Sequence, residues 1–344
     1  MLETAKKPSS PPYALLRAGF PFLATLGMRR VTTYCMDIVI GDNDELYVLC
    51  RADSPGLGGS NIRRTNWNDD DLDTLGGGKL LWPVQMIRDA EGTLYVSDEG
   101  NHKIFKFKQD GTAVGEWGEE GSGEGQMNRP SGIAFDADEN LWVVDTLNHR
   151  VQKFNKDGRY ISGFGSKGSG PGEFDMPWGI AVTGEGDILV ADWHNDRVQR
   201  FTPDGEFIME FGSSGSGDGE FNRPAGVEVD HQGDIYVADR GNNRIQQFAP
   251  DGRYVDKFIG DATLSKSGEI YVRANPAVLR NREMANTEQQ KRLRGPAMVR
   301  FDDQERMYIP DFGSHRIQVY KKQAYVLSPA EIAPQPNHPT LYTV

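Results

Sequence analysis

The sequence predicts an all-β fold, a six-bladed β-propeller, and two observations support this prediction. First, one segment recurs: units that open at Pro83, Pro130, Pro177 and Pro224 follow one another at a spacing of 47 residues. Second, each unit contains four short runs with alternating apolar and polar residues, rich in β-branched and aromatic side chains, which is typical of strands. Repeated four-stranded units of this length are the pattern of a propeller.

Two further units bring the count to six. Another copy of the motif opens at Pro296, 72 residues after Pro224, and reads PAMVRFDDQERMYIPDFGSHRIQVY. A degenerate copy begins at Met36 with MDIVIGDNDELYVLC. The spacing before Pro296 exceeds the regular one by 25 residues (72 minus 47), so we expect an insertion at about residues 261–295.

The unit that opens at Pro177 shows the order of the four strands. GIAV predicts the first strand, ILVAD the second, RVQRF the third and FIMEFG the fourth. The third and fourth are separated by Pro203, Asp204 and Gly205, which is a hairpin signal. A long Gly-rich connection, GSSGSGDGEFNRP, then leads to the first strand of the next unit.

The ring needs one strand from the N-terminus to close. The sixth unit ends with RIQVYKK, a third strand with no fourth after it, whereas FPFLATLGM resembles a lone fourth strand. We therefore expect residues 20–27 to complete the last blade, which removes an open sheet edge. This division gives an N-terminal extension (1–19), a propeller (20–322) and a Pro-rich tail (323–344) that lies extended over the surface.

Composition excludes several classes of function. The chain has 344 residues and a formal net charge of −12, which makes nucleic acid an unfavourable partner. No apolar run is long enough to cross a membrane, and the N-terminus lacks the apolar core of a signal peptide. The two cysteines, Cys35 and Cys50, form no framework, so a reduced cytoplasmic location is expected.

Aligning the units separates scaffold from exceptions. The acid at the end of the second strand and the base five residues later recur, which predicts an ion pair or turn cap in each blade; the acids are Asp98, Asp145, Asp192, Asp239 and Asp311, and the bases are Lys103, Arg150, Arg197, Arg244 and Arg316. His102, His149 and His315 share one position, where Asp196 and Asn243 also occur, so we interpret them as donors that stabilise a turn.

His194 is out of this register. The pair Trp193-His194 stands where other units carry small residues, and this favours a ligand-facing role.

The loops after the second strands and those before the first strands open on one face of a propeller, around its centre. Aromatic and basic residues gather there, and such a set suits a planar organic anion. The candidate ligand-binding residues are Trp82, Trp178, Trp193, Arg129, Arg223, Arg240, Asp37 and Gln85, and the candidate catalytic residues are His194 and Arg51. The alternative interpretation is that the arginines pair with the acidic surface, or that Trp193-His194 is an ordinary surface loop.

The repeated pattern Asp-x-x-Asn-His-Arg-Ile/Val-Gln-x-Phe-x-x-Asp-Gly resembles the NHL repeat over roughly residues 20–322. The first unit reads LYVLCRAD, with Arg51 after the second strand, and this resembles the first blade of peptidyl-α-hydroxyglycine α-amidating lyases. The resemblance implies a catalytic role for Arg51. It also implies zinc-binding histidines where this chain has Val84, Trp178 and Ala297, and a catalytic tyrosine where it has Leu147. These departures argue against amidating-lyase chemistry.

The end of the insertion, NPAVLRNREMANTEQQKRLRGP, predicts helix, with Asn275-Pro276 at a start and Gly295-Pro296 at the stop. The insertion connects a fourth strand with a first strand, so we expect it to cover the face that carries the candidate residues. The alternative is an insertion without a functional role.

Two functions remain open. The first is a protein that binds, and by lyase or hydrolase chemistry transforms, a small anionic or aromatic molecule at the centre of the ring. His194 would then act as the general acid or base, and Arg51 would stabilise a carboxylate or oxyanion. The second is a non-catalytic scaffold that docks a protein partner on the same face. No cofactor is expected, although a divalent cation at His194 with Asp37 nearby is left open.

Overall fold

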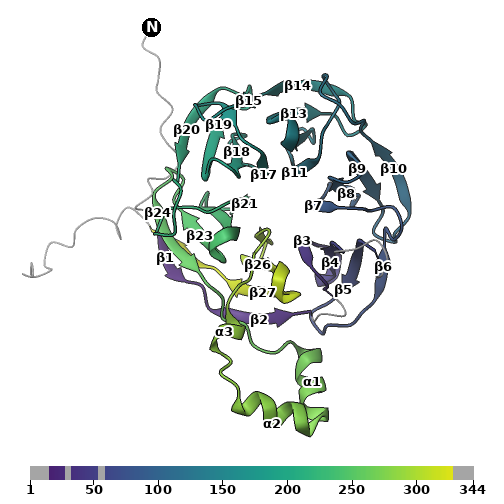
Figure 1. Ribbon diagram of the computed structural model, residues 1–344, viewed down its shortest axis with the longest axis vertical. Coiled ribbons are helices and arrows are strands. Elements are labelled where there is room, and N and C mark those ends of the chain that lie inside the picture. The colour runs from purple at the N-terminus through teal and green to yellow at the C-terminus, as the bar shows by residue number, and fades with distance from the viewer. Residues whose placement is uncertain (1–14, 28–31, 53–58, 328–344) are drawn as a thin grey trace, which may run out of the picture.

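The computed structural model describes residues 15–27, 32–52 and 59–327, and in these residues six four-stranded antiparallel sheets form a closed ring (Figure 1). The sequence prediction of a six-bladed all-β propeller is confirmed. Each sheet is a blade, and the first strands of neighbouring blades contact one another around the axis of the ring. None of the helices in these residues is long and apolar enough to span a membrane.

The blades follow one another along the chain. Blade 1 consists of β3 (Cys35–Ile40), β4 (Leu46–Cys50), β5 (Asn61–Thr65) and β6 (Asp73–Leu75), and blade 2 of β7 (Pro83–Arg88), β8 (Leu94–Asp98), β9 (Lys103–Phe107) and β10 (Ala113–Trp117). Blade 3 consists of β11 (Pro130–Phe135), β12 (Leu141–Asp145), β13 (Arg150–Phe154) and β14 (Tyr160–Phe164), and blade 4 of β17 (Pro177–Val182), β18 (Ile188–Asp192), β19 (Arg197–Phe201) and β20 (Phe207–Phe211). Blade 5 consists of β21 (Pro224–Val229), β22 (Ile235–Asp239), β23 (Arg244–Phe248) and β24 (Tyr254–Phe258).

Short elements lie in the connections. A two-stranded parallel ribbon, β15 (Ser166–Lys167) with β16 (Glu173–Phe174), lies between blades 3 and 4. Single 3-10 turns are η2 (Asp42–Asp44), η3 (Thr146–Asn148), η4 (Arg240–Asn242) and η5 (Phe312–Ser314). The last three follow second strands, so they stand at the face that the sequence predicts to be functional.

Blade 6 joins the two ends of the chain, as the sequence predicts. It consists of β25 (Arg300–Phe301), β26 (Arg306–Asp311), β27 (Arg316–Lys321) and, as its outer strand, β2 (Phe22–Leu26). β2 pairs antiparallel with β27, with Leu26 opposite Ile317. The pairing closes the ring with backbone hydrogen bonds and leaves β27 without an open edge.

A ribbon outside the ring was not expected. β1 (Leu15–Gly19) pairs with β28 (Gln323–Val326), so the N-terminal extension and the start of the predicted tail form a two-stranded sheet. Buried charges attach it to blade 5, because Arg17 and Lys322 both bind the carboxylate of Asp234. Lys322 also pairs with Asp230, and its side chain is fully buried.

The core lies between blades rather than within one sheet. Apolar residues of neighbouring blades form common clusters; for example, Leu189 and Val198 of blade 4 pack with Val227 and Val237 of blade 5. Around the axis the first strands approach closely. A Cβ atom at Gly179 would overlap the carbonyl oxygen of Ala225 in the next blade, so this position requires glycine.

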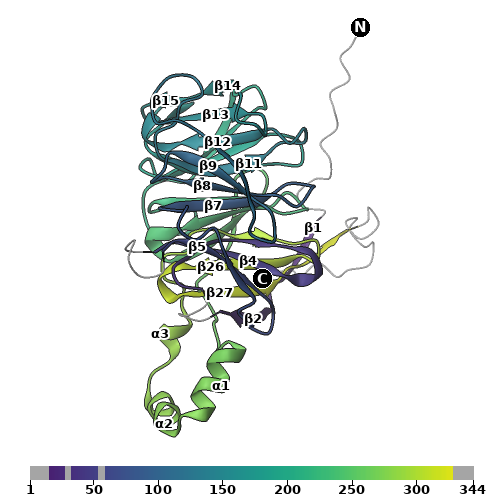
Figure 2. The ribbon, with the colours of Figure 1, turned by 90° about the vertical axis from the view of Figure 1, so that its right-hand side faces the viewer.

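The insertion is helical, but it does not cap the ring. It forms α1 (Lys266–Ala274), α2 (Pro276–Met284) and α3 (Glu288–Lys291). Figures 1 and 2 show these helices projecting outward from the edge of the ring beside β2, away from its axis. The expected cap is therefore wrong. Start and stop signals predicted helix in residues 275–296, where α2 and α3 lie, but α1 was not predicted. The direction of the helices depends on contacts at the rim, where the Ser267 amide donates to Asp69.

Candidate functional site

The recurring aspartates are the scaffold of the loops at this face. Asp192 is fully buried, and its carboxylate accepts hydrogen bonds from Arg197, from Asn195 and from the Asp175 amide, at 2.8–3.1 Å. Burial raises the pKa of Asp192, while these hydrogen bonds oppose the shift. Equivalent ion pairs occur in blades 3, 5 and 6. The predicted structural pair is confirmed in these four blades.

Blade 2 departs from this pattern. Lys103 pairs instead with Glu116, at 2.7 Å. Asp98 accepts from the backbone amides of Leu81 and Trp82, so the acid alone anchors this loop.

The histidines in the common register are structural, but they accept rather than donate. Nδ1 of His149 accepts from the Met176 amide at 3.0 Å, and His102 and His315 do the same for Arg129 and Tyr34. The interpretation as donors is therefore wrong. An acceptor role also explains why Asp196 and Asn243 occupy this position, since their side-chain oxygens accept in the same way.

The residue directly after each second strand points to the axis of the ring. In blades 2 to 6 its loop is held by the buried aspartate that ends the second strand, and in blade 1 the Arg51 amide donates to the Tyr34 carbonyl at 3.1 Å. The six residues are Arg51, Glu99, Thr146, Trp193, Arg240 and Phe312, and all of them line one pocket.

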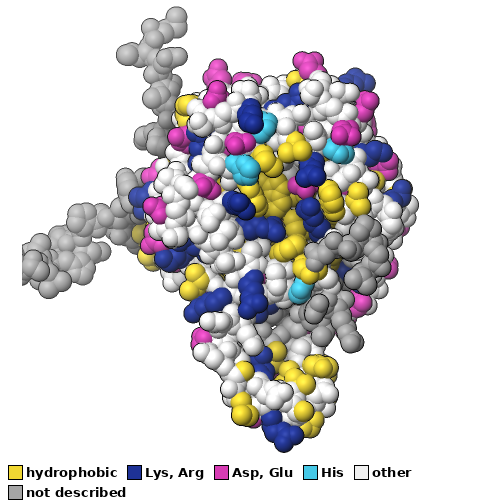
Figure 3. All heavy atoms as spheres, viewed as in Figure 1, with side chains coloured by type: hydrophobic (Ala, Val, Ile, Leu, Met, Phe, Trp, Pro, Cys, Tyr) yellow, Lys and Arg dark blue, Asp and Glu magenta, His cyan; other side chains and the backbone are white. Residues whose placement is uncertain are grey.

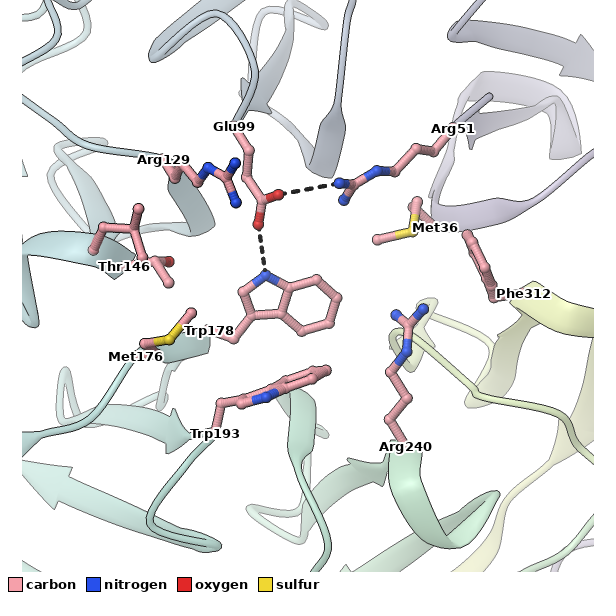
Figure 4. Close-up of a pocket in the computed structure, with 11 residues that line it drawn as sticks. Met36, Arg51, Glu99, Arg129, Thr146, Met176, Trp178, Trp193, Arg240 and Phe312 are labelled. Carbon is pink, nitrogen blue, oxygen red and sulfur yellow. Dashed lines mark hydrogen bonds and ion pairs between the residues drawn. The ribbon is translucent and has the colours of Figure 1, made fainter. Parts of the chain in front are cut away.

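The pocket has a volume of about 480 Å³, within the range of sites for small organic ligands. Met36, Arg129, Leu147, Met176 and Trp178 complete its lining. Figure 3 shows an apolar hollow at the centre of the ring with basic side chains around it. Figure 4 shows that the lining side chains converge from separate blades.

Trp178 forms the centre of this pocket. Its indole Nε1 donates to Oε1 of Glu99 at 3.0 Å, and Oε2 of Glu99 accepts from Arg51 at 3.2 Å (Figure 4). The Trp193 ring meets the Trp178 ring edge-to-face with a centroid distance of 5.0 Å. The two indoles thus form an apolar wall, and the N–H of Trp178 has a hydrogen-bond acceptor in Glu99.

Three guanidinium groups surround this wall. The guanidinium of Arg129 lies 5.2 Å from the ring centroid of Trp82, and that of Arg240 lies 4.7 Å from the centroid of Phe312 and 5.4 Å from that of Trp178. Burial, and secondly the charge of Arg51, lowers the pKa of Arg240 to about 10, so its guanidinium remains charged at neutral pH. Within residues 15–27, 32–52 and 59–327, neither Arg129 nor Arg240 forms an ion pair.

Five of the ten predicted site residues line the pocket; they are Arg51, Arg129, Arg240, Trp178 and Trp193. Trp82 lies behind them, beneath the guanidinium groups of Arg51 and Arg129. Arg223 is exposed and lies outside the lining. His194 also lies outside it: its imidazole is 42% exposed and faces Asp175, with Nδ1 3.6 Å from the carboxylate.

Asp37 and Gln85 are deeper in the ring and serve the scaffold. Asp37 is fully buried and forms an ion pair with Arg300, which also pairs with Glu228. The Gln85 amide exchanges two hydrogen bonds with the backbone of Ile133 in the next blade. Neither residue lines the pocket at the mouth.

Glu99 was not predicted, although it is the only carboxylate among the described residues of the lining. A usable signal was present, because Glu99 occupies the same repeat position as Arg51, Trp193 and Arg240. Sequence reasoning compared the position of His194 instead, which is one residue further along and directed away.

A metal site finds no support in the geometry. Among the described residues, no group of three His, Cys, Asp or Glu side chains is placed to hold an ion. Val84, Trp178 and Ala297 lie around a narrow cavity below the pocket, and none of them is a zinc ligand. His194 and Asp37 do not meet in one site, since Asp37 is engaged by Arg300.

Comparisons with known proteins agree with the architecture. The NHL repeat model matches residues 127–154, 174–201 and 221–248. No curated protein matches the chain in sequence.

Several solved structures share the fold. Virginiamycin B lyase from Staphylococcus aureus is 15% identical with a TM-score of 0.54, and the alignment covers 88% of this chain and 99% of that one. A putative gluconolactonase is 15% identical, with a TM-score of 0.56 and coverage of 91% and 93%. A protein of unknown function from Bacteroides thetaiotaomicron is 20% identical, with a TM-score of 0.59 and coverage of 89% and 72%. At these identities the likeness concerns the fold. The chain is a six-bladed β-propeller in which blades 3, 4 and 5 match the NHL repeat.

Proposed function

We propose that the pocket binds a small organic anion with a planar, apolar body. The observation that carries this proposal is the charge of the lining. Three arginines face one glutamate, which leaves a formal charge of +2 (three minus one) among the described residues. Arg129 and Arg240 are partly buried and have no carboxylate partner among the described residues, which is unfavourable for a cation, and a bound anion supplies that partner.

The walls support a ligand with an aromatic or otherwise flat body. Trp178, Trp193 and Phe312 present ring faces and edges, and Met36 and Met176 are adaptable apolar side chains. Arginine groups stacked on such rings retain free N–H donors in the plane of the guanidinium, which suits a carboxylate. The pocket therefore combines apolar contact with planar anion recognition.

A chemical step on the bound ligand belongs to the same proposal. Glu99 is the residue we assign to proton transfer, in place of His194, because Glu99 faces the pocket and His194 faces Asp175. The carboxylate would accept a proton from the ligand or from a water molecule, while Arg51 stabilises the oxyanion that develops. This is lyase or hydrolase chemistry, and a lyase and a putative gluconolactonase are among the proteins with this fold.

Calorimetric titration with benzoate, phthalate and naphthoate tests the binding step. We expect wild-type protein to bind at least one of these anions and to bind the matching neutral amide more weakly. Arg240→Gln removes one cation and should weaken anion binding about 10- to 100-fold, the effect of losing a charged hydrogen bond. Arg253→Gln is the matched control, because Arg253 is an exposed arginine in the last turn of the same blade.

Two results would count against the proposal. One is that no organic anion in the panel binds. The other is that Arg240→Gln and Arg253→Gln bind the anion as well as the wild type does, which would mean that the charge of the pocket serves another purpose.

A further inference from the structure

The helical arm, residues 266–294, is the largest departure from the repeat. Figures 1 and 2 show that it projects from the edge of the ring, and in α1 and α2 only Val272 is buried. Apolar side chains remain in solvent: Met284 is 87% exposed, Ile270 70% and Tyr271 55%. Each buried apolar side chain of this size contributes roughly 1.5–3 kcal/mol, so leaving several exposed on one projection is typical of an interaction surface.

The charge of the arm is opposite to that of the rest of the chain. It contains seven basic and three acidic side chains, a net charge of +4, whereas the whole chain has −12 and the remainder therefore −16. Arg280 and Arg282, on α2, form no ion pair within the part of the chain that the structure describes. Figure 3 shows basic and hydrophobic side chains together at the outer end of the arm.

An acidic surface lies at the base of the arm. Residues 70–73 are all exposed, with three aspartates and Leu72, which is 45% exposed. This acidic strip is held next to α1, because Lys266 donates to Asn68 at 2.7 Å and the Ser267 amide donates to Asp69 at 3.0 Å. One region of the molecule thus presents a basic apolar projection beside an acidic strip with an apolar side chain.

We propose that two copies of this chain form a two-fold symmetric dimer, with the helical arm of each copy packed on the acidic strip of the other. A two-fold interface requires a self-complementary surface, since each half must fit the other half on the partner. The positive helical arm beside the negative acidic strip meets this requirement. Both also carry exposed apolar side chains, whose attraction persists when salt screens the charges. The charge pairing is what selects a second copy of this chain as the occupant.

Sedimentation of the full chain over a range of concentrations tests the proposal. We expect a species of twice 38.3 kDa, and a dissociation constant that rises about tenfold or more from 50 to 500 mM salt. Ile270→Glu with Met284→Glu should give a monomer. Ile208→Glu is the matched control, because Ile208 is an exposed isoleucine on the outer strand β20, away from the arm.

Charge reversal makes the test specific for this pairing. Arg280→Glu with Arg282→Glu changes the net charge of α2 from +1 to −3, so that an acidic helix would face the acidic strip. Asp70→Lys with Asp73→Lys changes the net charge of residues 70–73 from −3 to +1, so that a basic strip would face the basic arm. Each should be monomeric alone, and an equimolar mixture should recover the dimer. Unchanged thermal melting shows that each variant is folded.

A wild-type chain that stays monomeric at 100 μM in low salt would overturn the proposal. The exposed side chains of the arm would then be a surface for a different protein. A dimer that persists in both charge-reversed variants would overturn it as well, because the contact would then lie on another face.

Discussion

The guanidinium of Arg51 in blade 1 lies 3.2 Å from the carboxylate of Glu99 in blade 2. The same carboxylate accepts the indole N–H of Trp178 in blade 4 at 3.0 Å, so one side chain connects three blades at the centre of the ring. A ligand anion that reaches Arg51 competes with Glu99 for it. Glu99 therefore lowers the positive charge of the pocket and holds Trp178 in place, and it is the residue that we propose for proton transfer.

Replacing Glu99 with Gln should separate binding from chemistry. Gln keeps one side-chain oxygen, which can accept from Trp178 or from Arg51 but not from both as Glu99 does, and it raises the formal charge of the pocket from +2 to +3. We expect a bound anion to gain about tenfold in affinity, or roughly 1.4 kcal/mol, and any turnover to be lost. Calorimetry and a turnover assay measure the two effects. Glu119→Gln, an exposed acid in the connection between blades 2 and 3, is the control and should change neither.

The neighbouring positions Asp192 and His194 should respond in opposite ways to alanine substitution. Asp192→Ala leaves Arg197 and the Asp175 amide without their buried acceptor and should cost about 1–3 kcal/mol of unfolding free energy. His194→Ala removes a half-exposed side chain and should leave the melting temperature unchanged. The melting temperatures of the two variants test this assignment. A lower melting temperature for His194→Ala, with an unchanged one for Asp192→Ala, would mean that His194 and not Asp192 supports the fold.

Closure of the ring by the N-terminus should be visible in truncations. A chain without residues 1–27 loses β1 and β2, exposes the edge of β27 and should melt roughly 10 °C lower or fail to stay soluble. A chain without residues 1–19 loses β1 and the pair between Arg17 and Asp234, so a smaller decrease is expected. Removal of residues 1–14 keeps both strands and is the control. Equal melting temperatures for all three would show that β2 is dispensable.

Two glycines of blade 4 offer a test of the contact between first strands. Gly179→Ala would place a Cβ atom on the Ala225 carbonyl and should destabilise the fold by about 1–3 kcal/mol, the usual cost of overpacking. Gly184→Ala has no neighbouring atom to meet and should leave stability nearly unchanged. Denaturant unfolding of both variants gives the comparison. If Gly179→Ala is as stable as Gly184→Ala, the strands around the axis are less tightly packed than the structure indicates.

The repeat determined the architecture from sequence alone. A regular spacing, a hairpin signal in the four regularly spaced units and a lone strand at residues 20–27 are local patterns, and they predicted six blades and the closure that β2 and β27 form. The aspartates were predicted as scaffold for the same reason, because a contact within one blade recurs at one offset. Arg51 and Trp193 were found as exceptions to the repeat.

Only the tertiary structure decided what meets at the centre. Glu99, Trp178 and Arg51 are far apart in the sequence, and the geometry of the closed ring brings them within hydrogen-bond distance. The same geometry directs His194 away from the pocket although it adjoins Trp193, since successive residues in a tight loop point in different directions. Local pattern predicts a blade because its contacts are local. The pocket and the direction of the helical arm depend on contacts between distant segments, which no spacing along one sequence specifies.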